Sequence, residues 1–191
     1  MSLSITGDAT ADQLLTDDPF ALLVGMLLDQ QIAMEAAFSG PAKILERVGT
    51  LEPAEIATQD PEGFEAVFRQ TPAVHRYPGS MAGRVQTLAA AVRDEWGGDA
   101  AAIWTQGSPD GAEVLKRLKA LPGFGEQKAK IFLALLGKQY GFDGAGWREA
   151  AGDYGQPGHR SVADITSPES LAKVREFKRE QKAAAKAAKA R

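Results

Sequence analysis

A short turn rich in proline and glycine, LPGFG from Leu121 to Gly125, separates two segments that have helical patterning. Pro122 ends the first helix, and Gly123 and Gly125 permit backbone angles that other residues avoid. Phe124 between them can turn inward. The amides of the turn and of the next helix's first turn then point outward, where they can bind a phosphate without a charged side chain. An ordinary helix–helix connection is the alternative interpretation of the same residues.

Helices must position this turn, because few stretches alternate with period two and most apolar residues fall at helical spacing. Asp18 and Pro19 are typical of a helix cap and first turn, and Ser80 and Ser167 are predicted caps further along the chain. A break is expected near Gly40 within the second helix. The segment 141–158 is rich in glycine and predicted to be irregular. The predicted helices cover residues 20–31, 34–48, 53–57, 61–69, 81–96, 111–120 and 126–140, with a last one starting at 168.

Composition limits the possible chemistry. The chain of 191 residues suits one domain or two small lobes. It has no cysteine, which excludes disulfides, thiolate catalysis and cysteine-ligated iron–sulfur clusters. With only His75 and His159, a histidine metal site is not expected either. The apolar run 20–28 is too short to cross a bilayer, and no signal-peptide pattern stands at the start, so we expect a cytoplasmic protein.

Charge is distributed unevenly along the chain. The net charge is −3, but residues 173–191 carry eight Lys or Arg and two Glu, a net charge of +6. The remainder carries 14 basic and 23 acidic side chains, a net charge of −9. The end of the chain, QKAAAKAAKAR, favours a helix with no apolar face. It is either a solvated terminal helix or an arm that contacts an anionic partner.

Three stretches, in order, resemble the HhH-GPD DNA glycosylases, the superfamily of endonuclease III, adenine glycosylase and 3-methyladenine glycosylase II. The first, DPFALLVGMLLDQQIAMEAA, resembles an early helix of the family and the helix that follows it. The second, VHRYPGSMAGRVQTLAAAV, resembles the segment that precedes the hairpin, and the third, LPGFGEQKA, resembles the helix-hairpin-helix itself. The resemblance spans 18–141. More narrowly, the chain resembles a small actinobacterial-type group described only as HhH-GPD base excision repair proteins.

The resemblance implies an all-α, two-lobed fold with a DNA-binding cleft between the lobes. It implies a domain over 1–172, with the helix-hairpin-helix at 112–140, followed by a basic helix or tail over 173–191. Such enzymes rotate a damaged nucleotide out of double-stranded DNA and cut its N-glycosidic bond. The implied partner is duplex DNA with an alkylated, deaminated or mispaired base, bound by a monomer associated with the nucleoid. No membrane is implied.

The hairpin of this family also holds a monovalent cation through main-chain carbonyls. Carried over by position, a structural Na⁺ or K⁺ would be held by the carbonyls of Lys119, Leu121 and Phe124. No cofactor is required for the reaction. The cation would bridge the hairpin and a DNA phosphate. That phosphate would also accept hydrogen bonds from the backbone amides of Gly123, Gly125 and Gln127.

Lyase activity in this family uses a lysine two residues after the second hairpin glycine. That position is Gln127, and an amide cannot form a Schiff base. Lys128 comes one position later, about 100° around the helix, and is expected to point elsewhere, as a phosphate contact or a solvated side chain. The resemblance therefore implies a monofunctional glycosylase that uses water. Gln30 and Gln31 match the residues that fill the gap left by the extruded nucleotide, with Gln31 the better match.

The catalytic aspartate of the family stands about 20 residues after the second hairpin glycine, where this chain has Ala145. Asp143 is the nearest acid and the expected catalytic carboxylate. Its alternative interpretation is a cap for a helix that begins near Trp147. Glu149 and Asp153 are substitutes. If none of these acids serves, the fold would recognise damaged DNA without cutting it.

Aromatic faces between the lobes would stack on the extruded base. Tyr77, Tyr140 and Trp147 are the candidates, although such aromatic residues are more often core than pocket residues. Trp147 is the best of them, because it follows the expected catalytic loop. Arg84 would contact a phosphate. A helical interaction protein unrelated to DNA is the remaining alternative, and the block 159–164 has no assigned mechanism.

Overall fold

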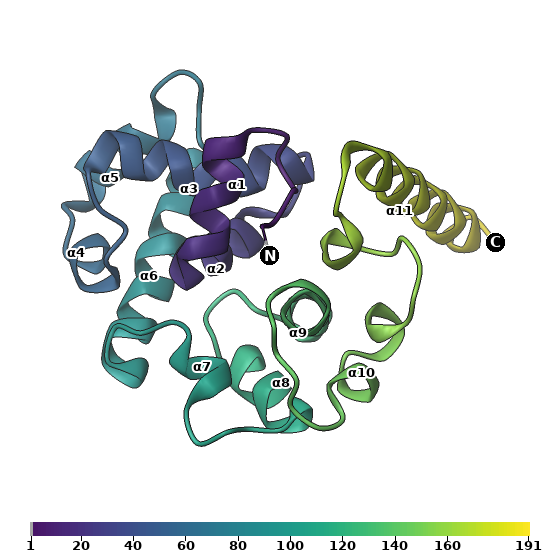
Figure 1. Ribbon diagram of the computed structural model, residues 1–191. Helices are drawn as coiled ribbons and strands as arrows, with labels where there is room; N and C mark the ends of the chain where they lie inside the picture. Colours follow the sequence, from purple (N-terminus) through teal and green to yellow (C-terminus); the bar gives the residue numbers. More distant parts are fainter. Residues whose placement is uncertain (1) are drawn as a thin grey trace.

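The computed structural model describes residues 2–191, and within that range it contains helices and no β-strand. The prediction of an all-α chain is confirmed. The helices are α1 (Ala9–Asp17), α2 (Pro19–Leu28), α3 (Met34–Val48), α4 (Pro53–Ala57), α5 (Pro61–Arg69), α6 (Pro78–Trp96), α7 (Ala102–Thr105), α8 (Gly111–Lys119), α9 (Glu126–Gln139), α10 (Trp147–Ala150) and α11 (Pro168–Lys189), with two short 3₁₀ helices, η1 (Gly152–Gly155) and η2 (Val162–Asp164) (Figure 1).

Short polar side chains start several of these helices. Asp18 accepts the N–H groups of Phe20 and Ala21 at the start of α2. Asp110 does the same for α8, and Ser167 forms a capping box at the start of α11. These contacts satisfy amides that have no partner inside the helix. The predicted caps at Asp18 and Ser167 are therefore confirmed.

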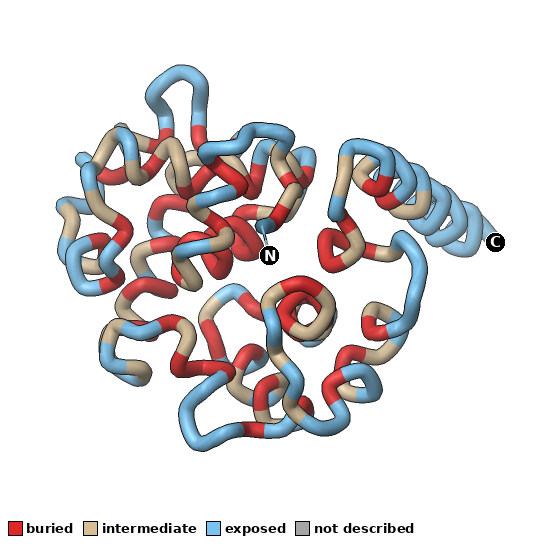
Figure 2. Tube along the Cα trace, in the orientation of Figure 1, coloured by how far each residue is buried: buried red, intermediate tan, exposed pale blue. Residues whose placement is uncertain are grey.

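Two buried helices organise the packing. Nine of the ten residues of α2 are buried, and α2 packs against α1, α3 and α6. Helix α9 is surrounded by α8, α10, η1 and η2, and Figure 2 shows its ring of buried residues at the centre of the view. Helix α9 therefore packs both against α8, which precedes the LPGFG turn, and against the segments that follow α9 in the chain.

Several helix boundaries differ from the sequence prediction. Helix α6 begins at Pro78, with Tyr77 as its N-cap, so the predicted cap at Ser80 was wrong. Proline fits the first helical turn, which makes the earlier start favourable. Helix α3 continues through Pro41 without the expected break. Helix α1 lies in a segment for which no helix was predicted.

Helix α11 is continuous across the boundary expected at 172/173. Ser170 and Val174 are buried near its start, whereas its last residues are exposed along their whole length (Figure 2). The basic tail is thus the outer part of a helix whose inner part packs on η2. Among the described residues, no helix has the length and apolar character needed to cross a bilayer.

Candidate functional site

The turn between α8 and α9 presents free backbone amides. Gly123 has φ of +82°, and a Cβ on it would collide with the Leu27 side chain of α2. Gly125 is the N-cap of α9, and a Cβ there would meet nothing within 4 Å. Within residues 2–191, no acceptor reaches the N–H groups of Glu126, Gln127 or Lys128. The turn therefore has the open amides and positive helix end that suit an anion.

The carbonyls of the same turn are mostly unused. The Leu121 carbonyl accepts the Phe124 N–H at 3.2 Å. Those of Lys119 and Phe124 accept no hydrogen bond from the described part of the chain. Free carbonyl oxygens are ligands that a hard cation prefers. No group of three or more His, Cys, Asp or Glu side chains suited to a metal exists among residues 2–191.

Gln30 and Gln31 lie in a turn beyond α2, because α2 ends at Leu28, three residues earlier than predicted. His75 holds this turn: its Nε2 lies 3.1 Å from the Leu28 carbonyl and 3.0 Å from that of Gln30. Arg84 donates to the Gln30 side chain at 3.4 Å. Gln31 is exposed with φ of +59°, a conformation that non-glycine residues rarely adopt and that concentrates at functional sites.

The Lys128 side chain turns toward the protein and does not extend into solvent. Its ammonium donates to the carbonyls of Met26 and Leu27, at 2.8 and 3.1 Å, and so caps the C-terminus of α2. Burial lowers the pKa of Lys128 to about 8, while the nearby Asp29 carboxylate raises it. Asp29 is itself buried, which raises its pKa, and it pairs with Lys178 of α11 at 3.7 Å.

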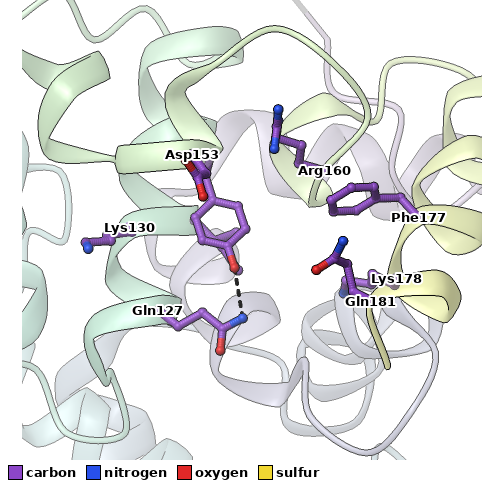
Figure 3. A pocket seen from close by; sticks show the side chains of 9 residues that line it. Gln127, Lys130, Asp153, Arg160, Phe177, Lys178 and Gln181 are labelled. Carbon is purple, nitrogen blue, oxygen red and sulfur yellow. Dashed lines mark hydrogen bonds between the residues drawn. The ribbon is translucent and has the colours of Figure 1, made fainter. Parts of the chain in front are cut away.

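A cavity of about 630 Å³ opens beside the N-terminal half of α9 (Figure 3). The Gln127 side chain lines it and donates to the Tyr154 hydroxyl at 2.9 Å. The backbone amide of Gln127 belongs to the free amides of the turn described above, so the turn and the cavity meet at this residue. The cavity is lined by Gln127, Lys130 and Ile131 of α9, Asp153 and Tyr154 of η1, Arg160 of the loop before η2, and Phe177, Lys178 and Gln181 of α11.

Ion pairing with α9 fixes the loop that carries Arg160. Lys138 donates to the Asp164 carboxylate at 2.6 Å and to the Gln156 carbonyl at 2.7 Å. The other oxygen of Asp164 accepts the backbone N–H of Arg160 at 2.8 Å. The block 159–164, which had no assigned mechanism from the sequence, thus positions one wall of the cavity.

Asp143 does not lie beside Gln127 and the turn, although it shares a cavity with Tyr140. It is exposed just beyond the C-terminal end of α9, which places it about 20 Å along the helix from Gln127. There it lines a smaller cavity with Trp104 and Tyr140. The chain then runs back along α9 and brings Asp153, one of the two substitutes named from the sequence, to the cavity at Gln127.

The three aromatic candidates also lie outside the cavity at Gln127. Trp147 is 8% exposed and packs against Gly137 of α9 and Gly111 of α8. Tyr140 donates its hydroxyl to the carbonyls of Leu15 and Thr16, at 3.2 and 2.8 Å, and burial raises its pKa to about 12. Tyr77 is 41% exposed, and Arg76 lies 5.5 Å from its ring centroid.

Sequence reasoning missed six of the cavity residues, Ile131, Tyr154, Arg160, Phe177, Lys178 and Gln181. Tyr154 and Arg160 stand in a segment without regular periodicity. Phe177 is the one aromatic residue within the basic tail, and that was the available signal. Comparison with protein-family models, with curated proteins and with solved structures found no match for this chain.

Proposed function

We propose that this protein is a monofunctional DNA N-glycosylase of base excision repair, with the cavity at Gln127 as the pocket for the extruded base. One observation carries the proposal: a backbone site suited to a phosphate and a polar cavity suited to a base share Gln127. A nucleotide rotated out of duplex DNA needs both, because its phosphate stays on the strand while its base enters the protein.

In this proposal the fold has the two lobes that the HhH-GPD resemblance implies. Helices α2 to α6 form one lobe and α8 to α10 the other, with Lys128 and Leu27 at the contact between them. Duplex DNA would lie across the amides of Gly123, Gly125 and Gln127. Arg84 would be at the edge of this surface, beside Gln30.

Gln31 is the side chain that we assign to the gap left by the extruded nucleotide. It is exposed and held in a strained backbone conformation, and it follows a turn fixed by His75. A glutamine amide can donate to and accept from the unpaired base opposite the gap. Gln30 would hold this turn in place. Its side-chain amide donates to the Leu27 carbonyl at 3.1 Å, and its side-chain oxygen accepts a hydrogen bond from Arg84.

Asp153 is the carboxylate that we assign to the reaction, in place of Asp143. Cleavage of the N-glycosidic bond builds positive charge on the sugar as the base leaves with the bonding electrons. A carboxylate near the sugar stabilises that charge and takes a proton from the water that attacks C1′. Asp153 lines the cavity that Gln127 enters, whereas Asp143 lies at the far end of α9.

Two further properties follow from the turn. Gln127 provides no amine for a Schiff base, and the Lys128 ammonium is bound to the end of α2, so no lyase step is expected. The free carbonyls of Lys119 and Phe124, with that of Leu121, would hold a Na⁺ or K⁺ that adds positive charge beside a DNA phosphate. We expect the protein to act as a monomer on nucleoid DNA.

A second candidate function is recognition of damaged DNA without cleavage. The observation that favours it is Ala145, which stands where the family's aspartate is expected. It shares the phosphate site and the cavity with the first proposal. The two differ only in whether a carboxylate reaches the sugar.

Release of free bases from alkylated and deaminated genomic DNA, measured by mass spectrometry, separates the two. Wild type, Asp153→Asn and Asp143→Asn would run side by side with duplex binding measured for each. We expect release by wild type and Asp143→Asn and loss of release, with binding retained, in Asp153→Asn. Loss of base release in Asp143→Asn alone would identify Asp143 as the catalytic carboxylate. No release by wild type, with binding intact, would establish the second function.

A further inference from the structure

Two aromatic side chains provide apolar surface in the cavity at Gln127. Tyr154 comes from η1, and its hydroxyl is fixed by the hydrogen bond from Gln127. Phe177 comes from α11, on the side of the cavity away from Asp153 in Figure 3. At about 630 Å³ the cavity exceeds what a purine needs. A planar ring can therefore enter and pack on aromatic surface, as bases do in other proteins.

The charged groups of the cavity are mainly positive. Lys130, Arg160 and Lys178 line it against a single carboxylate, that of Asp153. Lys130 has Glu126 at 3.5 Å and Lys178 has Asp29 at 3.7 Å, which offsets part of their charge. Within residues 2–191 no acid lies within 4.0 Å of the Arg160 guanidinium. A ring with a fixed positive charge would be repelled here.

Hydrogen-bonding groups in the cavity lack partners. The Nε of Arg160 is buried without a hydrogen bond to the described chain, and the exposed Gln181 amide lines the same cavity. Buried N–H groups nearly always have an acceptor, so this N–H is available to a carbonyl oxygen of a bound molecule. On the accepting side, the Gln127 amide oxygen and the Asp153 carboxylate can receive an N–H. The cavity thus offers donors for a carbonyl oxygen and acceptors for an adjacent N–H.

We propose that the cavity selects a neutral base that carries a lactam edge, a carbonyl beside an N–H, and rejects a base that carries a fixed positive charge. Uracil, hypoxanthine and 8-oxoguanine have this edge on a neutral ring, whereas 7-methylguanine has the edge together with a positive charge. This selection rests on the function proposed above. It gives α11 a place in recognition, because Phe177, Lys178 and Gln181 form one wall of the cavity.

The test uses the full-length protein and matched duplexes that each contain one uracil, hypoxanthine, 8-oxoguanine or 7-methylguanine. Base release and binding at fixed salt are measured on each. We expect one of the three lactam bases to be preferred over 7-methylguanine by at least about tenfold in both measurements. Which of the three is preferred distinguishes a deaminated from an oxidised substrate.

Failure of this inference can be told apart from failure of the proposed function. Release of 7-methylguanine as fast as the lactam bases would keep the glycosylase and overturn the selection. If no base is released from any duplex, the glycosylase proposal fails, and binding alone decides the selection. Tenfold tighter binding to a lactam duplex would then support it, and equal binding to all duplexes would overturn it.

A matched pair of variants tests the wall formed by α11. Gln181→Glu replaces an amide by an isosteric carboxylate, which repels a carbonyl oxygen and attracts a cation. We expect the preference for the lactam base to fall about tenfold. Ala183→Glu adds the same charge two residues along, about 200° around the exposed helix, and should keep the preference. Equal effects of both variants would mean that Gln181 does not contact the base, and would overturn its assignment.

Discussion

The Nζ atom of Lys128 lies 2.8 Å from the carbonyl oxygen of Met26 and 3.1 Å from that of Leu27. A side chain at the start of α9 thereby satisfies carbonyls at the end of α2, about 100 positions earlier in the chain. Together with the contact between Gly123 and Leu27, it fixes the LPGFG turn beside Gln30 and Gln31. The turn and the candidate gap-filling residues are thus held at a set distance.

The titration of Lys128 provides a direct check of this contact. We expect an ammonium midpoint at about 8 by NMR of the side chain, because burial lowers the pKa of Lys128. Asp29→Asn should lower this pKa further, because the Asp29 carboxylate favours the charged ammonium. Asp143→Asn, at the far end of α9, is the control and should leave the midpoint in place. A midpoint at the ordinary lysine value of about 10.4 would contradict the contact.

The two glycines of the turn should respond differently to alanine. Gly123→Ala forces a Cβ into Leu27 and a side chain into positive φ, so we expect a loss of about 1–3 kcal/mol in the free energy of unfolding. Gly125→Ala has open space and φ of −76°, so its stability should change by less than about 0.5 kcal/mol. Its methyl group would instead stand at the free amides that we propose as the phosphate site. DNA affinity should therefore fall about tenfold, equivalent to about 1.4 kcal/mol. Unchanged DNA affinity of Gly125→Ala would show that the turn does not contact DNA.

Tyr140 and Tyr77 form a second matched pair. Tyr140→Phe removes the hydroxyl that donates to the carbonyls of Leu15 and Thr16. We expect it to lower the free energy of unfolding in urea by about 1–2 kcal/mol, because a partly buried hydrogen bond is lost. Tyr77→Phe alters an exposed ring and should leave stability unchanged. If base release fell in Tyr140→Phe while stability stayed the same, Tyr140 would belong to the reaction after all.

His75 should make stability depend on pH. Burial lowers its pKa in the folded protein, while hydrogen bonds to the carbonyls of Gln30 and Leu28 oppose that shift. The unfolded chain therefore binds a proton at His75 more readily, and the free energy of unfolding should fall as pH drops below about 6.5. The fall should level off once the lowered folded pKa is passed. Protonation also removes the Nδ1 acceptor of the Tyr77 N–H.

Urea unfolding from about pH 7.5 to about pH 5 measures this dependence. His75→Asn should flatten the curve over this range, because it removes the buried titrating group. His159→Asn, at the exposed histidine, should keep the wild-type slope. A flat curve for wild type would show that His75 is equally easy to protonate in both states.

Local signals in the sequence determined much of the fold. The helical spacing of apolar residues predicted the all-α class, and Asp18 and Ser167 marked helix starts that the structure contains. The LPGFG turn was predicted from Pro122 and the two glycines. Proline restricts the backbone angle φ and glycine allows a wider range of backbone angles, whatever residues surround them. The absence of cysteine excluded whole classes of chemistry.

The tertiary structure decided which distant residues meet. The end of α2 at Leu28 depends on Lys128 and His75, and neither is close to it in the chain. Spacing from the hairpin pointed to Asp143, but the path of the chain after α9 brings Asp153 to Gln127 instead. The inner part of α11 packs on η2, which turns part of a basic tail into a cavity wall. Caps and turns act within a few residues and can be predicted, whereas a cavity depends on packing between segments that only the folded chain brings together.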